Sequence, residues 1–282
     1  MDIKKVGVVG CGILGSGIAQ TSAQFGYQVV VSDVNDQLLN KGLNSIASSL
    51  KKGVEKGKMS KEEMDAILGR IKGTTDMGAF ADCDLMIEAV AEDLEVKKKV
   101  FAELDKICPP HAILATNTSV LSVTDIAIVT KRLDKILGIH FSNPVTVMKM
   151  LEVIKTLATS DETLTTARDF CTSIGKKTVV AKDAAGFLAN RMLCPFLLNA
   201  IRMIEAGYAV EDIDAICKEG MGHPMGPLTL LDLIGIDTVY TGAVAVYDEL
   251  KDPQYSPPTL MKKMVAMGWH GRKTGKGFYE YK

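Results

Sequence analysis

Seven short apolar runs in the first two thirds of the chain constrain its fold more than any other feature. They are rich in valine and isoleucine and apolar on both faces, which is typical of strands covered by helices on both sides. Most are separated by segments of helical length, so strand and helix alternate as they do in a doubly wound sheet. The runs cover residues 4–10, 27–33, 84–90, 112–117, 135–141, 151–155 and 177–181.

Two regions depart from this alternation. Residues 36–70 are polar with helical spacing and contain Gly53 and Gly57 as expected breaks, which predicts a helical hairpin inserted after the second strand. The last hundred residues show helical periodicity without strand alternation. We therefore predict an α/β fold: a Rossmann-like, doubly wound, mostly parallel sheet over residues 1–185, followed by an all-α C-terminal domain over 186–282.

Bulk composition narrows the possible partners. The net charge is −1, from 33 basic and 34 acidic residues, so the chain has no general attraction for nucleic acid or anionic membranes. We identify no apolar stretch of the roughly 18 residues that a membrane span needs, nor a secretory signal. The six cysteines are scattered without a CxxC pair, and the histidines lack metal-ligand spacing. We expect a cytoplasmic protein with reduced thiols, without nucleic-acid, membrane or metal partners.

The first apolar run leads directly into a glycine-rich turn, GCGILGSG. Gly10, Gly12 and Gly15, with Ile13 and Leu14 between them, form a GxGxxG pattern that joins a strand to a helical segment. The first glycine permits a tight turn, the second lets the backbone approach a pyrophosphate, and the third lets the helix pack against the strand. The N–H groups at the helix N-terminus attract the anion. The turn therefore predicts a dinucleotide site.

The end of the second run favours NAD as that dinucleotide. Asp33 stands 18 residues after Gly15, where a carboxylate accepts hydrogen bonds from ribose hydroxyls and repels the 2′-phosphate of NADP. No arginine follows it in residues 34–36. A flavin could use the same turn, although the chain is short for a flavin enzyme. A flexible glycine turn with a surface aspartate is the alternative without a cofactor.

Polar residues gather at the ends of later runs, where open sheets bind their ligands. Ser119 comes soon after the fourth run, His140 lies near the end of the fifth, and Glu152 lies in the sixth. An imidazole suits proton transfer near neutral pH, and a carboxylate on its other nitrogen would fix its tautomer. His140 and Glu152 are thus a candidate acid/base dyad; the alternative is that both residues are structural.

Seven motifs appear in order over nearly the whole chain, and together they resemble the L-3-hydroxyacyl-CoA dehydrogenase family, in particular its bacterial 3-hydroxybutyryl-CoA dehydrogenases. These motifs are VGVVGCGILGSGIAQ (6–20), IEAVAEDLEVKKKVFAELD (87–105), ATNTSVLSVTDIA (115–127), GIHFSNPVTVMKMLEVI (138–154), GFLANRM (186–192), HPMGPLTLLDLIG (223–235) and GRKTGKGFYEY (271–281).

The resemblance implies that the chain interconverts (S)-3-hydroxybutyryl-CoA and acetoacetyl-CoA, or short-chain homologues, with NAD(H). It assigns His140 as the acid/base, Glu152 as its partner acid, and Ser119 and Asn190 to the substrate. It also implies a homodimer formed through the C-terminal helices. The implied NAD contacts are Glu92, Lys97, Ser119, Asn143 and Lys273, and the implied coenzyme A contacts are Ser49, Lys56, Ser119 and Asn190.

Two other functions stay open on the sequence. One is a dehydrogenase for a free β-hydroxyacid, which would act without the coenzyme A moiety. The other is a non-catalytic, crystallin-like relative that keeps NAD binding without turnover. The intact set of Ser119, His140, Glu152 and Asn190 argues against the second.

Overall fold

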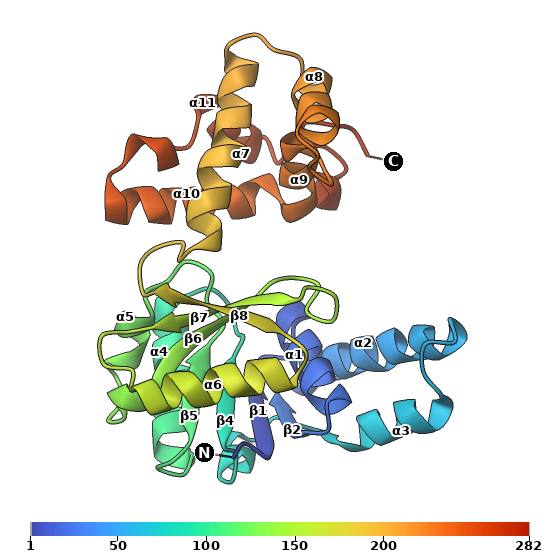
Figure 1. Cartoon of the computed structure of the whole chain (residues 1–282), viewed down its shortest axis with the longest axis vertical. Coiled ribbons are helices and arrows are strands. Elements are labelled where there is room, and N and C mark those ends of the chain that lie inside the picture. Colours follow the sequence, from blue (N-terminus) through green and yellow to red (C-terminus); the bar gives the residue numbers. More distant parts are fainter. Residues whose placement is uncertain (1, 282) are drawn as a thin grey trace. The chain divides into compact units, whose positions relative to one another are not determined.

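The computed structural model describes residues 2–281, which fall into two compact units divided between Asp183 and Ala184. The first unit contains a sheet with helices, and the second is built from helices (Figure 1). The strands are β1 (Lys5–Val9), β2 (Gln28–Ser32), β3 (Ile71–Thr74), β4 (Leu85–Glu88), β5 (Ile113–Thr116), β6 (Ile136–Phe141), β7 (Met150–Lys155) and β8 (Lys177–Lys182). The helices of the first unit are α1 (Ile13–Gln24), α2 (Asp36–Glu55), α3 (Lys61–Gly69), α4 (Leu94–Ile107), α5 (Val123–Ala127) and α6 (Asp161–Ser173).

The strands form one sheet in the order β3-β2-β1-β4-β5-β6-β7-β8. The chain moves outward from β1 first in one direction and then in the other, as a doubly wound sheet does. Neighbouring strands are parallel except β6 and β7, so β7 and β8 run against the rest. All seven predicted strands are present, which confirms the mostly parallel Rossmann-like sheet. β3 is absent from the predicted strands, because this short edge strand, IKGT, lacks an apolar run.

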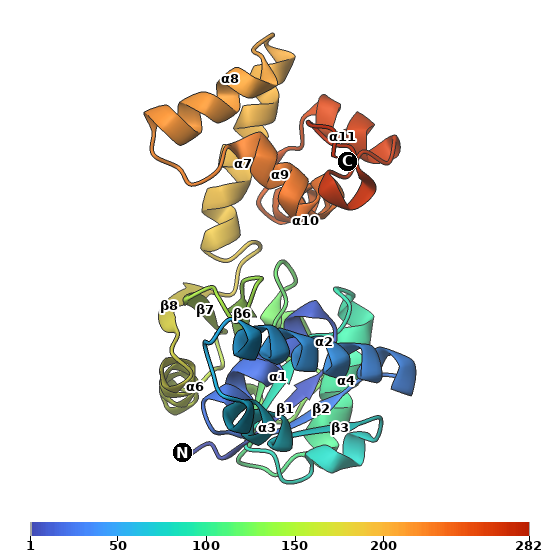
Figure 2. The same cartoon turned by 90° about the vertical axis from the view of Figure 1, so that its right-hand side faces the viewer.

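Side chains from both faces of the sheet are buried, as the two-sided apolar runs predicted. Val6 and Val8 of β1 pack in one core with Ile18 of α1 and Phe170 of α6. Phe101 of α4 is also fully buried, and Figures 1 and 2 place α4 and α6 on opposite faces of the sheet. A sheet covered on both faces leaves the ends of its strands as the place for a ligand.

Helices α2 and α3 form the hairpin that the sequence predicted for residues 36–70. Ser60 and Glu63 make a capping box that fixes the start of α3, and Gly57 turns the chain with a φ of +66°. The expected break at Gly53 is wrong, because this residue lies inside α2. The Met59 side chain of the returning segment packs over it, and one interior glycine costs a helix only about 1 kcal/mol.

The second unit consists of α7 (Ala189–Glu205), α8 (Val210–Ala215), α9 (Pro227–Ile234), α10 (Ile236–Leu250) and α11 (Thr259–Ala266), with a π-helical turn over Ile216–Gly220. This confirms the predicted all-α C-terminal region. The buried carboxylate of Asp232 accepts hydrogen bonds from the Phe278 and Tyr279 amides and so fixes the last residues of the chain against α9. Within residues 2–281 no single helix could span a membrane; only α9 and α10 together have the length and apolarity, and they meet at 96°.

The six cysteines are buried free thiols, as predicted. Burial raises the pKa of the Cys11 thiol to about 11 and that of Cys83 to about 12. These side chains therefore act as small apolar core residues.

Candidate active site

The predicted site residues of the first unit gather where the parallel strands end. Gly10 follows β1, Asp33 follows β2, Glu92 follows β4 and Ser119 follows β5, while His140 is the second-last residue of β6. Carboxyl ends of neighbouring parallel strands meet at one edge, so the topology brings these five residues, 130 positions apart in sequence at the extremes, to the same rim.

The glycine turn has the geometry that a pyrophosphate needs. Gly10 has a φ of +95°, and a Cβ on Gly15 would lie 1.7 Å from the carbonyl oxygen of Gly10. Gly12 differs, since a Cβ there would meet no other part of residues 2–281 within 4 Å. The turn is therefore closely packed on its inner side and open at Gly12, the N-cap of α1, where helix N–H groups attract an anion.

Asp33 ties the second strand to this turn. One carboxylate oxygen accepts the Cys11 amide at 2.9 Å and the other accepts the Val34 amide at 2.8 Å. Each oxygen keeps a further lone pair for a ribose hydroxyl. The residue fits the adenosine ribose of a bound dinucleotide and also stabilises the turn that holds the phosphates.

Ser119, His140 and Glu152 form a continuous hydrogen-bonded array. Nδ1 of His140 lies 2.8 Å from Oε2 of Glu152, and Nε2 lies 3.1 Å from Oγ of Ser119. The side chains of His140 and Glu152 are 11% and 6% exposed. The structure brings the predicted dyad together and adds a contact from Ser119 to His140, which the sequence pattern did not predict.

The array fixes the direction of its hydrogen bonds. A carboxylate only accepts hydrogen bonds, so Nδ1 of His140 carries a hydrogen and donates it in a hydrogen bond to Glu152. In the neutral ring Nε2 then carries no hydrogen, and it accepts a hydrogen bond from the Ser119 hydroxyl. An imidazole held in this state can take a proton from an alcohol placed beside Nε2, and the ion pair with Glu152 stabilises the resulting imidazolium.

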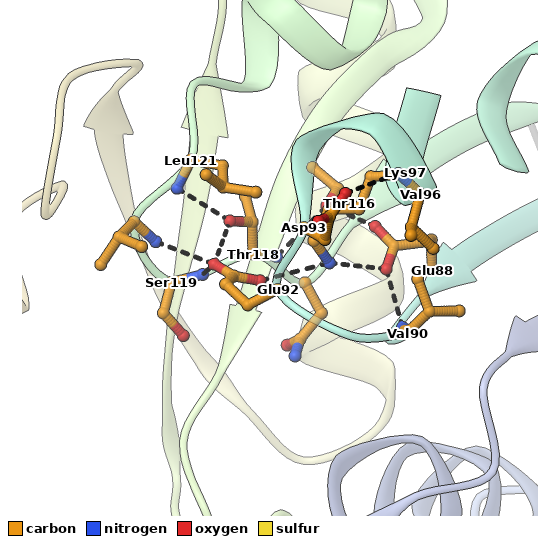
Figure 3. Close-up of polar contacts among 12 residues, drawn as sticks. Glu88, Val90, Glu92, Asp93, Val96, Lys97, Thr116, Thr118, Ser119 and Leu121 are labelled. Carbon is orange, nitrogen blue, oxygen red and sulfur yellow. Dashed lines mark hydrogen bonds and ion pairs between the residues drawn. The ribbon is translucent and has the colours of Figure 1, made fainter. Parts of the chain in front are cut away.

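Behind the Ser119 loop lies a network of charges (Figure 3), in which Glu88 and Lys97 are buried and Glu92 is exposed. Glu92 accepts hydrogen bonds from the Ser119 and Val120 amides at 2.8 and 3.2 Å, and Lys97 lies 3.3 Å from its other oxygen. Partial burial raises the pKa of Glu92, but the Lys97 charge and hydrogen bonds from the loop outweigh it, so the pKa is lowered. Lys97 also contacts Glu88 at 2.7 Å, which the sequence analysis did not single out; a lone acid in an apolar strand was the available signal.

The remaining predicted residues lie apart from this array or in the second unit. Asn143 is exposed after β6, and Ser49 is exposed on α2. Lys56 is the C-cap of α2. Asn190 is the second residue of α7. Lys273 pairs with Asp237 at 2.6 Å.

No three His, Cys, Asp or Glu residues within 2–281 are grouped so that they could hold a metal ion. Nδ1 of His140 contacts a carboxylate, and Nε2 contacts a hydroxyl. The chemistry of the array is therefore that of proton transfer.

Comparison with known proteins finds dehydrogenases that are similar to this chain over its full length. A 3-hydroxybutyryl-CoA dehydrogenase of Mycobacterium tuberculosis is 44% identical over 282 residues, covering 99% of both chains. A probable 3-hydroxybutyryl-CoA dehydrogenase of Bacillus subtilis is also 44% identical, over 100% of this chain and 98% of its own. The crystal structure of (S)-3-hydroxybutyryl-CoA dehydrogenase from Ralstonia eutropha is 41% identical and superposes with a TM-score of 0.97 over 100% of both chains.

Two family profiles together match nearly every residue. The profile of the 3-hydroxyacyl-CoA dehydrogenase NAD-binding domain matches residues 5–184, and that of the 3-hydroxyacyl-CoA dehydrogenase C-terminal domain matches residues 186–281. The NAD-binding profile agrees with the glycine turn and Asp33, and not with a flavin site. The chain belongs to the 3-hydroxyacyl-CoA dehydrogenase family.

Proposed function

We propose that the chain interconverts (S)-3-hydroxybutyryl-CoA and acetoacetyl-CoA with NAD(H). The observation that carries the proposal is the array of Ser119, His140 and Glu152 at the same sheet edge as the glycine turn. The names of relatives at 41–44% identity over the whole chain support this substrate class.

The array supplies the proton transfer of this reaction. NAD, held by the glycine turn and Asp33, would supply the acceptor for the hydride that leaves C3 of the substrate. Nε2 of His140 takes the hydroxyl proton as the C3–O bond becomes a carbonyl, and Glu152 stabilises the imidazolium. In the reductive direction the imidazolium returns that proton to the oxygen. The Ser119 hydroxyl, released from Nε2, orients the substrate oxygen.

The first unit holds the cofactor in this proposal. Gly10, Gly12 and Gly15 receive the pyrophosphate, and Asp33 receives the adenosine ribose. Glu92, Lys97 and Asn143 are further NAD contacts by family resemblance. Lys97 is 1% exposed, so its contribution there passes through Glu92.

We assign substrate binding and dimerisation to the second unit, with the domain boundary at residue 185. Asn190 would hold the substrate and Lys273 the cofactor, as the family resemblance implies. Exposed methionines such as Met192 and Met221 give this unit an apolar surface, which suits a homodimer contact. Sedimentation equilibrium of the purified chain tests the dimer, and a monomer at micromolar concentration would reject it.

Ser49 and Lys56 are proposed to contact coenzyme A. They lie seven residues apart, which is two turns of helix, and both are exposed. They therefore share one side of α2, where the lysine ammonium can attract a phosphate. We also place the protein in the cytoplasm, where its six thiols stay reduced.

The decisive assay follows NADH oxidation with acetoacetyl-CoA, repeated with NADPH and with longer 3-ketoacyl thioesters. We expect rapid turnover with NADH and poor use of NADPH. His140→Gln should lower kcat by roughly 10²–10⁴-fold, the scale of a lost general base, with NADH binding intact. The matched control is His111→Gln, because His111 also contacts an acid, Asp84 at 3.2 Å, but is largely exposed; its kcat should not change.

Activity on free 3-hydroxybutyrate comparable with that on the thioester would favour the free β-hydroxyacid dehydrogenase instead. Tight NADH binding with no turnover of either substrate would favour the crystallin-like relative. Normal kcat in His140→Gln would remove the assigned acid/base.

A further inference from the structure

Glu88 is a carboxylate sealed inside the first unit, at the last position of β4. Its side chain is 0% exposed. One oxygen accepts the Val90 amide at 2.8 Å and the Lys97 ammonium at 2.7 Å, and the other accepts the Thr116 hydroxyl at 2.7 Å (Figure 3). Burying a charge is unfavourable unless it is paired and hydrogen-bonded, and these contacts meet that condition.

Lys97 connects this sealed carboxylate to the rim of the site. Its ammonium lies between two acids, 2.7 Å from Glu88 and 3.3 Å from Glu92. The shorter distance is to Glu88, so the Lys97 ammonium interacts more strongly with Glu88 than with Glu92. The Glu92 carboxylate can therefore accept hydrogen bonds from the loop. Glu92 uses that freedom on the backbone amides of Ser119 and Val120 and on the Thr118 hydroxyl.

We propose that Glu88 is a positioning residue for the Ser119 loop, acting through Lys97 and Glu92. The proposal rests on the proposed function, because the loop places the Ser119 hydroxyl 3.1 Å from Nε2 of His140, the proposed acid/base. Without the charge of Glu88, Lys97 is balanced by Glu92 alone. The Glu92 carboxylate is then drawn toward the ammonium and away from the loop amides.

The charge arrangement gives this role a direct signature. The Thr116 hydroxyl is a second link from Glu88 to the loop, because it donates to Glu88 at 2.7 Å and accepts the Thr118 amide at 3.2 Å. Glu88→Gln keeps an amide that can bond this hydroxyl, so the loss of charge acts on the loop mainly through Lys97 and Glu92. The effect of Glu88→Gln on the loop should therefore be largely lost in a variant in which Glu92 no longer binds the loop amides as a carboxylate. A residue that served only to stabilise β4 and β5 would lack this dependence.

The test is a double-mutant cycle of Glu88→Gln and Glu92→Gln in the full chain, read by kcat with NADH and acetoacetyl-CoA. We expect Glu88→Gln to lower kcat about tenfold, the effect of a small misplacement in a site, with the KM for acetoacetyl-CoA unchanged. The double variant should be no more than about twofold slower than Glu92→Gln. Unchanged kcat in Glu88→Gln, or fully multiplicative losses in the double variant, would overturn the proposal.

Hydrogen exchange of the Ser119 and Val120 amides gives a readout that does not depend on the substrate. We expect exchange to be faster in Glu88→Gln, and unchanged exchange would overturn the positioning role even if the wild type lacks activity on acetoacetyl-CoA. Absence of that activity in the wild type would instead count against the proposed function. The two failures are thus distinguishable.

Two further variants test whether the effect on the loop is specific to the charge of Glu88. Asp105→Asn is the matched control, because Asp105 pairs with Arg132 at 2.7 Å in a partly buried site away from the loop; its kcat and loop exchange should match the wild type. If Glu88→Gln does not fold, the double variant Glu88→Gln with Lys97→Met removes both buried charges together. Because no ammonium then draws Glu92 from the loop, this variant should show wild-type exchange at Ser119 and Val120, and faster exchange there would overturn the proposal.

Discussion

His140 and Glu152 are direct partners across the antiparallel pair β6 and β7. This pair is where the sheet changes direction, and it places the two side chains on the same face, with Nδ1 and Oε2 2.8 Å apart. Directly opposed residues in antiparallel strands have Cβ atoms about 4.5–5.5 Å apart. The dyad is therefore built into the register of the sheet and does not depend on a flexible loop.

Glu152→Gln is expected to lower kcat by roughly 10²-fold, with little change in the KM for NADH. The amide has no charge to stabilise the imidazolium, and its NH₂ group can donate to Nδ1 and favour the wrong tautomer. Steady-state kinetics in both directions measure the effect. A kcat within threefold of the wild type would show that Glu152 only fills space.

Sequence patterns predicted the parts of this site that local chemistry determines. The glycine turn needs Gly10 and Gly15 at a fixed spacing, and the strand end needs an acid at Asp33, so both could be read from one segment each. The array of His140 and Glu152 was proposed from polar residues in apolar strands. The same pattern indicated Ser119, whereas family resemblance supplied the role of Ser119 and both the position and the role of Asn190.

The tertiary contacts could not be read in the same way. Whether Lys97 reaches a cofactor or a buried acid depends on how α4 lies against β4, which no spacing records. The edge strand β3 has no apolar run, and none of its four residues is buried. In both cases the deciding partners are distant in sequence.

Gly12→Ala and Gly15→Ala form a matched pair that separates cofactor binding from folding. A methyl group on Gly15 would lie 1.7 Å from the Gly10 carbonyl oxygen, whereas on Gly12 it would point into open space. We expect Gly15→Ala to lose several kcal/mol of folding stability, as overpacked backbone positions do. Gly12→Ala should lose about 1 kcal/mol or less and raise the KM for NADH at least tenfold.

Thermal unfolding and NADH titration measure the two effects. Equal stability losses in the two variants would contradict the assignment of the open side of the turn to the pyrophosphate. So would normal NADH affinity in Gly12→Ala.

Glu92 should make stability depend on pH in the acid range. Its pKa is lowered in the folded protein, because the Lys97 charge and the loop hydrogen bonds outweigh the effect of burial. Because the folded pKa is lowered, ionised Glu92 contributes to the free energy of unfolding. This contribution is fully present above the unfolded pKa of about 4.3 and is lost as the pH falls through the folded pKa. Glu92→Gln should therefore be less stable than the wild type at pH 7, and the difference should shrink below about pH 4. Urea unfolding at several pH values measures this, and a difference that grows toward acid would have the wrong sign.

The six cysteines should be inert in the folded enzyme. The thiolate is the reactive form, and burial raises the pKa of Cys11, Cys108 and Cys194 to about 11 and that of Cys83 and Cys171 to about 12; burial also raises the pKa of Cys217. At pH 8 we expect Ellman's reagent to modify no thiol within minutes in the native protein and six after denaturation. Cys11 is the informative position, because it lies in the glycine turn and its amide bonds Asp33. Rapid modification there, blocked by NADH, would mean that the turn opens far more often than its packing indicates.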